Sequence, residues 1–377
     1  MLNIGVVVHG PQIIDSHSAY EIIELLKDYG DVKARLGGTM GRTAVIDAQL
    51  ETVIDISHKL LPSQSVNLFV EEKMDVIFLL DYGKSQTTGH AFGFKVYNKS
   101  NNPPLIQIER PKEKDGTIIP WNTKQKQLTE EIAQKLKLKI TQPEEIIHTE
   151  FPDFQKQKPK THSNLEYHKN TIKRKIAGVN KEENIFVNGI VIGKATSENL
   201  TIITQNNYIT QLTGGLIKEH GVEKLGKVDI QKAIVKTGLL RRSQIVEPRI
   251  LTKETNKQLT AAFLDHAAED VYSLKDNDIV VTIGDDTTLI ASDILYRFST
   301  PIIGITDGDL DKVVEKGFQN KDSMIIELDH GWDDIIGIKI YQELFNSQKT
   351  IKIDSINDFK DEIIRIINQT PAEYIIQ

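Results

Sequence analysis

Residues 302–311 read IIGITDGDLD, and this stretch decides how the C-terminal half of the chain is interpreted. An apolar run ends at Thr306, and three aspartates follow at alternate positions, Asp307, Asp309 and Asp311. The apolar run predicts a buried strand, which should end where the acids begin because aspartate is a poor strand former. Neighbouring carboxylates repel one another, so the arrangement indicates a bound cation, a helix cap or a solvated turn.

Two neighbouring stretches repeat this arrangement. VVTIGDDTTL (280–289) and MIIELDHGWDD (324–334) each place acids directly after a predicted strand. Because the carboxyl ends of parallel strands lie at one edge of a sheet, the three acidic segments should meet in one crevice. Oxygen ligands without sulfur favour Mg²⁺ or Mn²⁺ over zinc. The predicted metal ligands are Asp285, Asp307, Asp309 and Asp311; the alternative is that Asp286 and Asp307 cap helices and the other acids are solvated.

Two pairs of residues are candidates for binding the phosphates of a nucleotide. Thr287 and Thr288 stand where a helix should begin, a position that suits a phosphate oxygen. Arg241 and Arg242, in KTGLLRRS (236–243), offer a cationic clamp, and a solvated turn is the alternative.

Composition excludes several classes of protein. The chain has no cysteine, which excludes disulfides, thiolate nucleophiles and thiolate metal sites. A net charge of −7 argues against binding nucleic acid over the whole chain. No window of eighteen apolar residues predicts a membrane span, and MLNIGVVVHG lacks the basic segment of a secretory signal. We therefore expect a cytoplasmic protein without a membrane partner or a specific nucleic-acid partner.

The predicted fold class is α/β, with two Rossmann-like domains built on mainly parallel sheets and a small β-rich insert. A chain of 377 residues is too long for one core. Buried strand runs such as LNIGVVVHG and MDVIFLLD alternate with amphipathic segments, which predicts an N-terminal α/β domain over 1–150. Residues 151–180 carry many lysines and no apolar period, which predicts an exposed basic linker; an arm that follows phosphates is the alternative.

The rest of the chain is interpreted as a second α/β domain over 181–345 with a β-rich start. Short β-branched runs separated by Asn, Gly and Ser predict strands near 183–240. Residues 254–274, ETNKQLTAAFLDHAAEDVYSL, are predicted to form a helix. Residues 346–377 are predicted to be a C-terminal strand and helix extension.

The glycines of the N-terminal domain suggest weaker hypotheses. DYGKS (81–85) is not a P-loop, because Phe78 stands where that motif needs glycine. Gly83, Gly89 and Gly93 still follow a predicted strand, together with Lys84 and His90, and indicate a pocket at the sheet edge. The turns with His9, Gly10 and Asp15, and with Gly37, Gly38, Gly41 and Arg42, indicate an anion site or simply tight turns.

Residues 280–336 resemble the archaeal 6-hydroxymethylpterin diphosphokinase family, a relative of thiamine pyrophosphokinase. Asp285 matches the aspartate of an alanine-aspartate-glycine motif, and Thr306 and Asp307 match the start of a threonine-aspartate-leucine-aspartate motif. His330 and Gly331 match a third, acidic motif. Asp286, Leu328 and Trp332 depart from the family pattern, and a Gly-Asp pair is inserted in TDGDLD.

The resemblance implies transfer of a diphosphoryl group from ATP to a small hydroxymethyl or hydroxyl acceptor, with Mg²⁺ bridging phosphate oxygens. It implies catalytic roles for Asp307 and for His330, which would orient a phosphate or act as a general acid. The alternative is a non-catalytic ligand-binding or assembly factor in archaeal cofactor metabolism, which the departures from the motifs favour. A metal-dependent nuclease is a weaker reading because the chain is acidic.

The N-terminal half resembles an uncharacterised family of methanogenic archaea, and this resemblance implies no activity. We expect a small-molecule substrate or cofactor, and the sequence leaves a homo-oligomer open.

Overall fold

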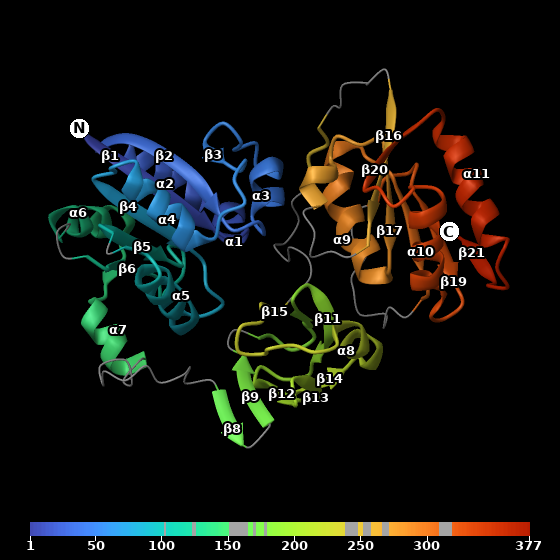
Figure 1. The fold of residues 1–377 in the computed structure, drawn as a ribbon. Coiled ribbons are helices and arrows are strands. Elements are labelled where there is room, and N and C mark those ends of the chain that lie inside the picture. The colour runs from blue at the N-terminus through green and yellow to red at the C-terminus, as the bar shows by residue number, and fades with distance from the viewer. Residues whose placement is uncertain are drawn as a thin grey trace. The chain divides into compact units, whose positions relative to one another are not determined.

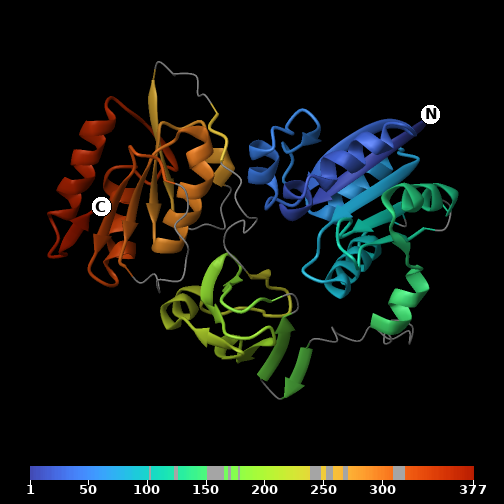
Figure 2. The ribbon, with the colours of Figure 1, turned by 180° about the vertical axis from the view of Figure 1, so that it is seen from behind.

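The computed structural model describes residues 1–101, 103–122, 126–150, 165–168, 171–176, 179–237, 248–251, 258–265, 271–308 and 319–377. The chain divides into two compact units (Figures 1 and 2). Unit 1 comprises Met1–Ser163 and Arg241–Arg249, and unit 2 comprises Asn164–Leu240 and Ile250–Gln377. Among the described residues, no helix has the length and apolar character needed to cross a membrane.

Unit 1 is built on a seven-stranded sheet in the order β3-β2-β1-β4-β5-β6-β7. The first five strands of this order, β3-β2-β1-β4-β5, are parallel to one another. Strand β6 is antiparallel to β5, and β7 is parallel to β6. The strands are β1 (Leu2–His9), β2 (Gly30–Gly37), β3 (Ile54–Asp55), β4 (Val76–Asp81), β5 (Leu105–Glu109), β6 (Thr117–Pro120) and β7 (Lys139–Ile140).

Helices cover both faces of this sheet, which is why its central strands are apolar without alternation. Val6 and Val8 pack with one group of helices, and Val7 packs with the other. The first group is α1 (Gln12–Asp15), α2 (Ser18–Leu26), α3 (Arg42–Asp47) and α6 (Lys126–Leu136). The second group is α4 (Pro62–Glu71), α5 (Gln86–Asn98) and α7 (Pro143–Glu150).

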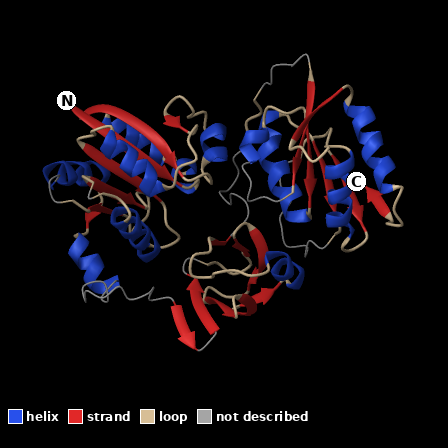
Figure 3. Cartoon of the chain, viewed as in Figure 1, coloured by secondary structure: helices blue, strands red, loops and turns tan. Residues whose placement is uncertain are grey.

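The first part of unit 2 is β-rich, as the sequence predicts (Figure 3). Two four-stranded sheets, β14-β11-β10-β15 and β13-β12-β9-β8, enclose one apolar core to which Ile185 and Ile202 both belong. The elements are β8 (Leu165–His168), β9 (Thr171–Ile176), β10 (Asn184–Val187), β11 (Ile190–Ala195), β12 (Leu200–Gln205), β13 (Tyr208–Thr213), β14 (Gly215–Ile217), α8 (Glu219–Leu225) and β15 (Val235–Thr237).

The end of the predicted basic linker is part of this β-rich structure. Strands β8 and β9 form a hairpin, and β9 pairs along its whole length with β12. The basic side chains did not prevent pairing because Arg174 donates to the carbonyl oxygens of Ile230 and Ala233, at 2.6 and 2.8 Å. Residues 151–164 of the predicted linker lie outside the described residues.

The second part of unit 2 is an α/β structure around a six-stranded sheet in the order β20-β16-β17-β18-β19-β21. Its four central strands are parallel, and both edge strands are antiparallel to their neighbours. Helix α9 packs on one face, and α10 and α11 pack on the other. The elements are β16 (Leu259–Leu264), β17 (Ile279–Ile283), α9 (Asp285–Leu295), β18 (Ile302–Thr306), β19 (Met324–Leu328), α10 (Trp332–Glu343), β20 (Thr350–Ile353), α11 (Ile356–Ile367) and β21 (Tyr374–Ile376).

The structure bears on three predictions about the fold. The helix predicted over 254–274 contains strand β16, whose residues Ala261, Ala262 and Leu264 are fully buried between two neighbouring strands. A short apolar run cannot be assigned to helix or strand by periodicity alone. Residues 346–377 contain a strand and a helix, β20 and α11, and a further strand, β21; β20 and β21 form the two edges of the sheet. The α/β class is confirmed, but two Rossmann-like domains are not, because antiparallel strands enter both large sheets.

The C-terminal helix should therefore contribute to the stability of unit 2. Ile363 of α11 is fully buried, and its replacement by alanine should lower the free energy of unfolding by about 2–5 kcal/mol. Ile338 of α10 is exposed, so Ile338→Ala should change it by no more than ~0.5 kcal/mol. Chemical denaturation measures both values, and equal small effects would show that the segment is dispensable.

Candidate functional site

The acidic segments of unit 2 lie at one edge of its six-stranded sheet. Strands β17, β18 and β19 are parallel and adjacent, so their carboxyl ends are neighbours. The backbone N–H of Asp307 donates to Asp285 Oδ2 at 3.4 Å, and the N–H of Gly331 donates to Asp307 Oδ2 at 2.8 Å. The structure thus brings together three chain segments that follow three different strands.

Asp307 is the buried centre of this edge. Its side chain is 2% exposed, whereas the side chain of His330 is 74% exposed, and their Oδ2 and Nδ1 atoms lie 3.2 Å apart. A buried carboxylate beside one ring nitrogen orients the imidazole and leaves its other nitrogen toward solvent. His330 is therefore placed to exchange a proton with, or to hydrogen-bond, a group that reaches this edge.

A cavity of about 70 Å³ opens beside Asp285, and both parts of unit 2 line it. The β-rich part contributes Gly189, Ile190, Val191, Lys218, His220, Gly221 and Lys224, and the α/β part contributes Ile283, Gly284, Asp285, Asp286, Thr287 and Asp333. Sites that enclose a whole drug-sized ligand measure roughly 300–1,000 Å³. This cavity therefore suits a hydrated ion or one phosphate group.

Cations of the β-rich part face the carboxylates across this cavity. Lys224 Nζ lies 2.8 Å from Asp334 Oδ1, and Lys218 Nζ lies 3.9 Å from Asp286 Oδ2. His220 Nε2 lies 3.8 Å from Asp334 Oδ2. Burial alone would lower the pKa of Lys224, but the hydrogen bond and the charge of Asp334 outweigh burial and raise it. Lys224 is therefore a fixed positive charge at the cavity wall.

Asp333 carries the perturbed carboxyl of the cavity. Burial raises its pKa to about 6, and the charge of Asp307 adds to the rise, whereas the hydrogen bond from the N–H of Asp334 opposes it. A Cβ atom added to Gly284, the residue before α9, would lie 3.7 Å from Asp333 Oδ2. The Asp333 carboxyl therefore points toward Gly284. A carboxyl with this pKa changes its charge close to neutral pH.

Of the other predicted site residues, one lines the cavity, one faces away from it, and four lie outside the described residues. Thr287 lines the cavity, but the hydroxyl of Thr288 is buried in a 2.8 Å hydrogen bond with Thr282 and faces the sheet. Asp309, Asp311, Arg241 and Arg242 lie outside the described residues. Within the described ranges, no three histidine, aspartate or glutamate side chains are arranged to hold a metal ion.

Comparison with known proteins places the chain in a family. A family model described as "Uncharacterized protein conserved in archaea (DUF2117)" matches residues 6–348. The chain belongs to this archaeal family. It is also 44% identical to "Uncharacterized protein MJ0065" of Methanocaldococcus jannaschii over 381 residues, which cover 99% of each chain. The resemblance to an uncharacterised archaeal family is thereby confirmed, and the resemblance to the diphosphokinases stays a prediction.

In this member of the family, sequence reasoning missed the cationic wall of the cavity. Lys218, His220 and Lys224 lie near α8, more than sixty residues before the first acidic segment, and ordinary spacing relations cannot connect them. Asp333 was noted only as one acid in a group. Its position in the first turn of α10 after a glycine was the available signal.

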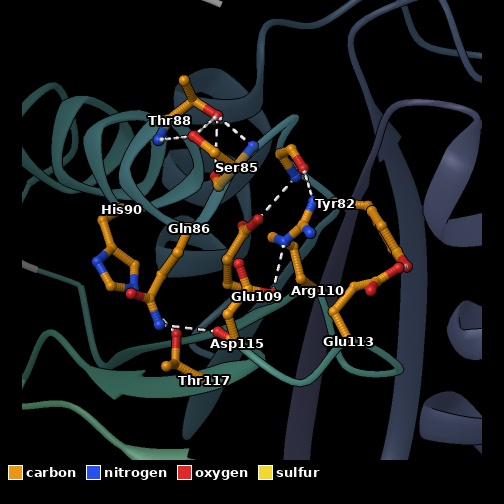
Figure 4. Close-up of polar contacts among 11 residues, drawn as sticks. Tyr82, Ser85, Gln86, Thr88, His90, Glu109, Arg110, Glu113, Asp115 and Thr117 are labelled. Carbon is orange, nitrogen blue, oxygen red and sulfur yellow. Dashed lines mark hydrogen bonds and ion pairs between the residues drawn. The ribbon is translucent and has the colours of Figure 1, made fainter.

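The structure shows the surroundings of the glycine turns of unit 1. The N–H of Gly38 donates to the carbonyl oxygen of Leu60 at 2.7 Å, and Arg42 is buried. His90 is buried too, with Nε2 3.0 Å from the hydroxyl of Thr117 (Figure 4). These residues position the loops around the sheet edge.

Asp333 should make the stability of unit 2 depend on pH. Since its folded pKa is raised from 3.8 to about 6, its contribution is complete below pH 4 or so and is lost as the pH rises through about 6. Asp333→Asn should remove this loss, which denaturation of both proteins across the range measures. The exposed Asp361→Asn on α11 is the control, and identical curves for wild type and Asp333→Asn would contradict the assignment.

Proposed function

We propose that unit 2 binds a nucleotide with Mg²⁺ and transfers a diphosphoryl group from ATP to a small hydroxymethyl or hydroxyl acceptor. One observation carries the proposal: carboxylates that follow β17 and β19 line one small cavity together with Lys218 and Lys224 of the β-rich part, and Asp307 after β18 donates its N–H to Asp285 of that cavity. Carboxylates suit a cation, and lysines suit phosphate oxygens. A metal-bound polyphosphate carries both a cation and phosphate oxygens, so it can contact the carboxylates and the lysines at the same time.

The donor set at the edge fits Mg²⁺. Mg²⁺ is usually held by one or two carboxylates, with the remaining positions filled by water and substrate phosphates. Asp285 and Asp307 supply these carboxylates, and Asp309 and Asp311 follow two and four residues later in the chain. When bound, Mg²⁺ neutralises charge on the phosphate oxygens during transfer.

The side chains around the cavity have distinct roles in this proposal. Lys218 and Lys224 hold phosphate oxygens, at the expense of their ion pairs with Asp286 and Asp334. His330, oriented by Asp307, donates a proton to the departing phosphate or holds one of its oxygens. The small volume of the cavity implies that only phosphate groups enter it and that the nucleoside lies outside.

The second candidate is a ligand-binding or assembly factor without catalysis. It is supported by the ion pairs that already engage Asp286 and Asp334, and by the departures from the diphosphokinase motifs at Asp286, Leu328 and Trp332. The same edge would then sense a phosphorylated cofactor. Both candidates bind a phosphorylated ligand, but only the diphosphotransferase converts ATP to AMP.

Asp307 should be needed for Mg²⁺ binding in either case. Asp307→Asn removes the charge of the buried carboxylate but keeps its size, and calorimetry should show Mg²⁺ affinity reduced about tenfold or more, which is about 1.4 kcal/mol. Asp361→Asn should leave the affinity unchanged. Equal affinity of wild type and Asp307→Asn would remove Asp307 from the site.

The reaction itself is tested by AMP release from ATP with pterin alcohols and other small hydroxymethyl acceptors. Asp307→Ala should lower the rate by about 10²–10³, the usual effect of losing one electrostatic group. His330→Gln should cost on the order of 10² if the imidazole is the general acid. If wild type binds ATP but releases no AMP with any acceptor, and both variants lose only binding, the sensor function replaces catalysis.

A further inference from the structure

A second group of polar side chains lies at the carboxyl edge of the sheet in unit 1. His9, Asp81 and Glu109 are the last residues of β1, β4 and β5. From β1 the chain proceeds outward to β2 and β3, and then returns to β4 on the other side of β1. Ligands of open α/β sheets bind at the point where the strand order reverses, and here that point lies between His9 and Asp81.

The imidazole of His9 is held from two sides. Its Nδ1 lies 2.8 Å from Asp81 Oδ1, and the ring of Phe92 on α5 stacks on it with centroids 4.0 Å apart and planes at 16°. The side chain of Asp81 is 6% exposed, whereas that of His9 is 34% exposed. Because the carboxylate accepts the proton of Nδ1, Nε2 keeps a lone pair on the open side of the ring.

A buried acid supports Asp81 from behind. Glu109 Oε1 accepts from the N–H of Gly83 at 2.6 Å, and Oε2 accepts from Gln107 Nε2 at 3.2 Å. Burial raises the pKa of Glu109 to about 9, and the charge of Asp81 adds to the rise. Burial and the charge of Asp81 therefore favour the protonated form of Glu109. Figure 4 shows Glu109 and Arg110 directed toward the loop between β4 and α5.

Glycines make the room for this buried acid. A side chain on Gly89 would begin 2.0 Å from the carboxyl carbon of Glu109, and one on Gly83 would begin 2.9 Å from its Oε1. A side chain on Gly93 would begin 1.7 Å from Gln107 Oε1. Burying a carboxyl group costs free energy. Because the loop with Gly83 and the helix with Gly89 leave room for the buried Glu109 carboxyl, we infer that Glu109 has a role beyond packing.

The other side of the imidazole is kept clear. Gly10 has φ +80°, and a side chain there would meet no heavy atom within 4 Å. Gly38 has φ +90°, and the only near atom is Cδ2 of His9 itself, at 3.9 Å. These two glycines therefore leave room near the imidazole, and the carboxylate of Asp81, 2.8 Å from its Nδ1, favours a neutral ligand over an anionic one.

We propose that His9 is the catalytic base of a second site, separate from the proposed diphosphotransferase, which acts on a neutral acyl compound such as an ester. The oxygen of water or of an alcohol attacks the acyl carbon while its proton passes to Nε2 of His9. The leaving group departs with the electron pair of the broken acyl bond and takes up the proton. Asp81 keeps the Nδ1 proton and stabilises the imidazolium, and Glu109 holds Asp81; both are positioning residues.

The test uses p-nitrophenyl acetate as a neutral probe and the full chain. His9→Gln should lower its hydrolysis on the order of 10²-fold, the usual contribution of a general base. His58→Gln is the matched control, because His58 is exposed and lies 3.6 Å from Asp55. Unchanged circular dichroism shows that the variants are folded. Equal hydrolysis by wild type and His9→Gln, or equal losses in the two histidine variants, would overturn the proposal.

Two further measurements separate the roles of the other groups. In ¹⁵N spectra, the wild-type ring of His9 should carry its proton on Nδ1, and Asp81→Asn should move the tautomer toward Nε2–H and slow the hydrolysis. An unchanged tautomer would remove Asp81 from the proposal. Mono-p-nitrophenyl succinate, an anionic ester, should react more slowly than the acetate, and a faster reaction would overturn the assignment of a neutral ligand.

Discussion

The parallel pairing of β17, β18 and β19 is the interaction on which the proposed nucleotide site depends. Continuous backbone pairing aligns Thr282 with Gly304 and Thr306 with Glu327, so the chain leaves all three strands at one edge. Apolar residues on both faces of these strands secure that register, since a shift by one residue would turn every side chain to the other face. The acids could not be gathered so closely by a local motif.

Such a concentration of carboxylates creates an electrostatic problem, which the β-rich part of unit 2 solves. Lys218 and Lys224 place positive charge opposite Asp286 and Asp334, and Asp333 keeps its proton to a higher pH than an exposed acid. Removing two charges from water is repaid only when their partners are close. In the proposed function, the same lysines would hold phosphate oxygens and exchange one set of ion pairs for another.

Unit 1 meets a similar constraint by different means. Burial raises the pKa of its acid Glu109 to about 9, and the N–H of Gly83 and the amide of Gln107 donate to its carboxyl oxygens. Gln107 is held in turn by the indole N–H of Trp121 at 3.0 Å. The two sheets thus present different side chains at their carboxyl edges, carboxylates facing lysines in unit 2 and a histidine beside buried acids in unit 1.

The sequence by itself determined the central strands β1, β4, β17, β18 and β19 and the edge at which the acids of unit 2 meet, because long apolar runs bounded by glycine and aspartate have few other interpretations. It misassigned β16, since TAAFL is compatible with helix or strand until its neighbours on both sides are known. The sequence also indicated that Gly83, Gly89 and Gly93 make room at the sheet edge, but it does not show which side chains fill that room. Only the tertiary structure decided that Glu109 and Gln107 occupy this space, that Asp81 faces His9, and that Lys224 faces Asp334, because these contacts join residues from 18 to 110 positions apart.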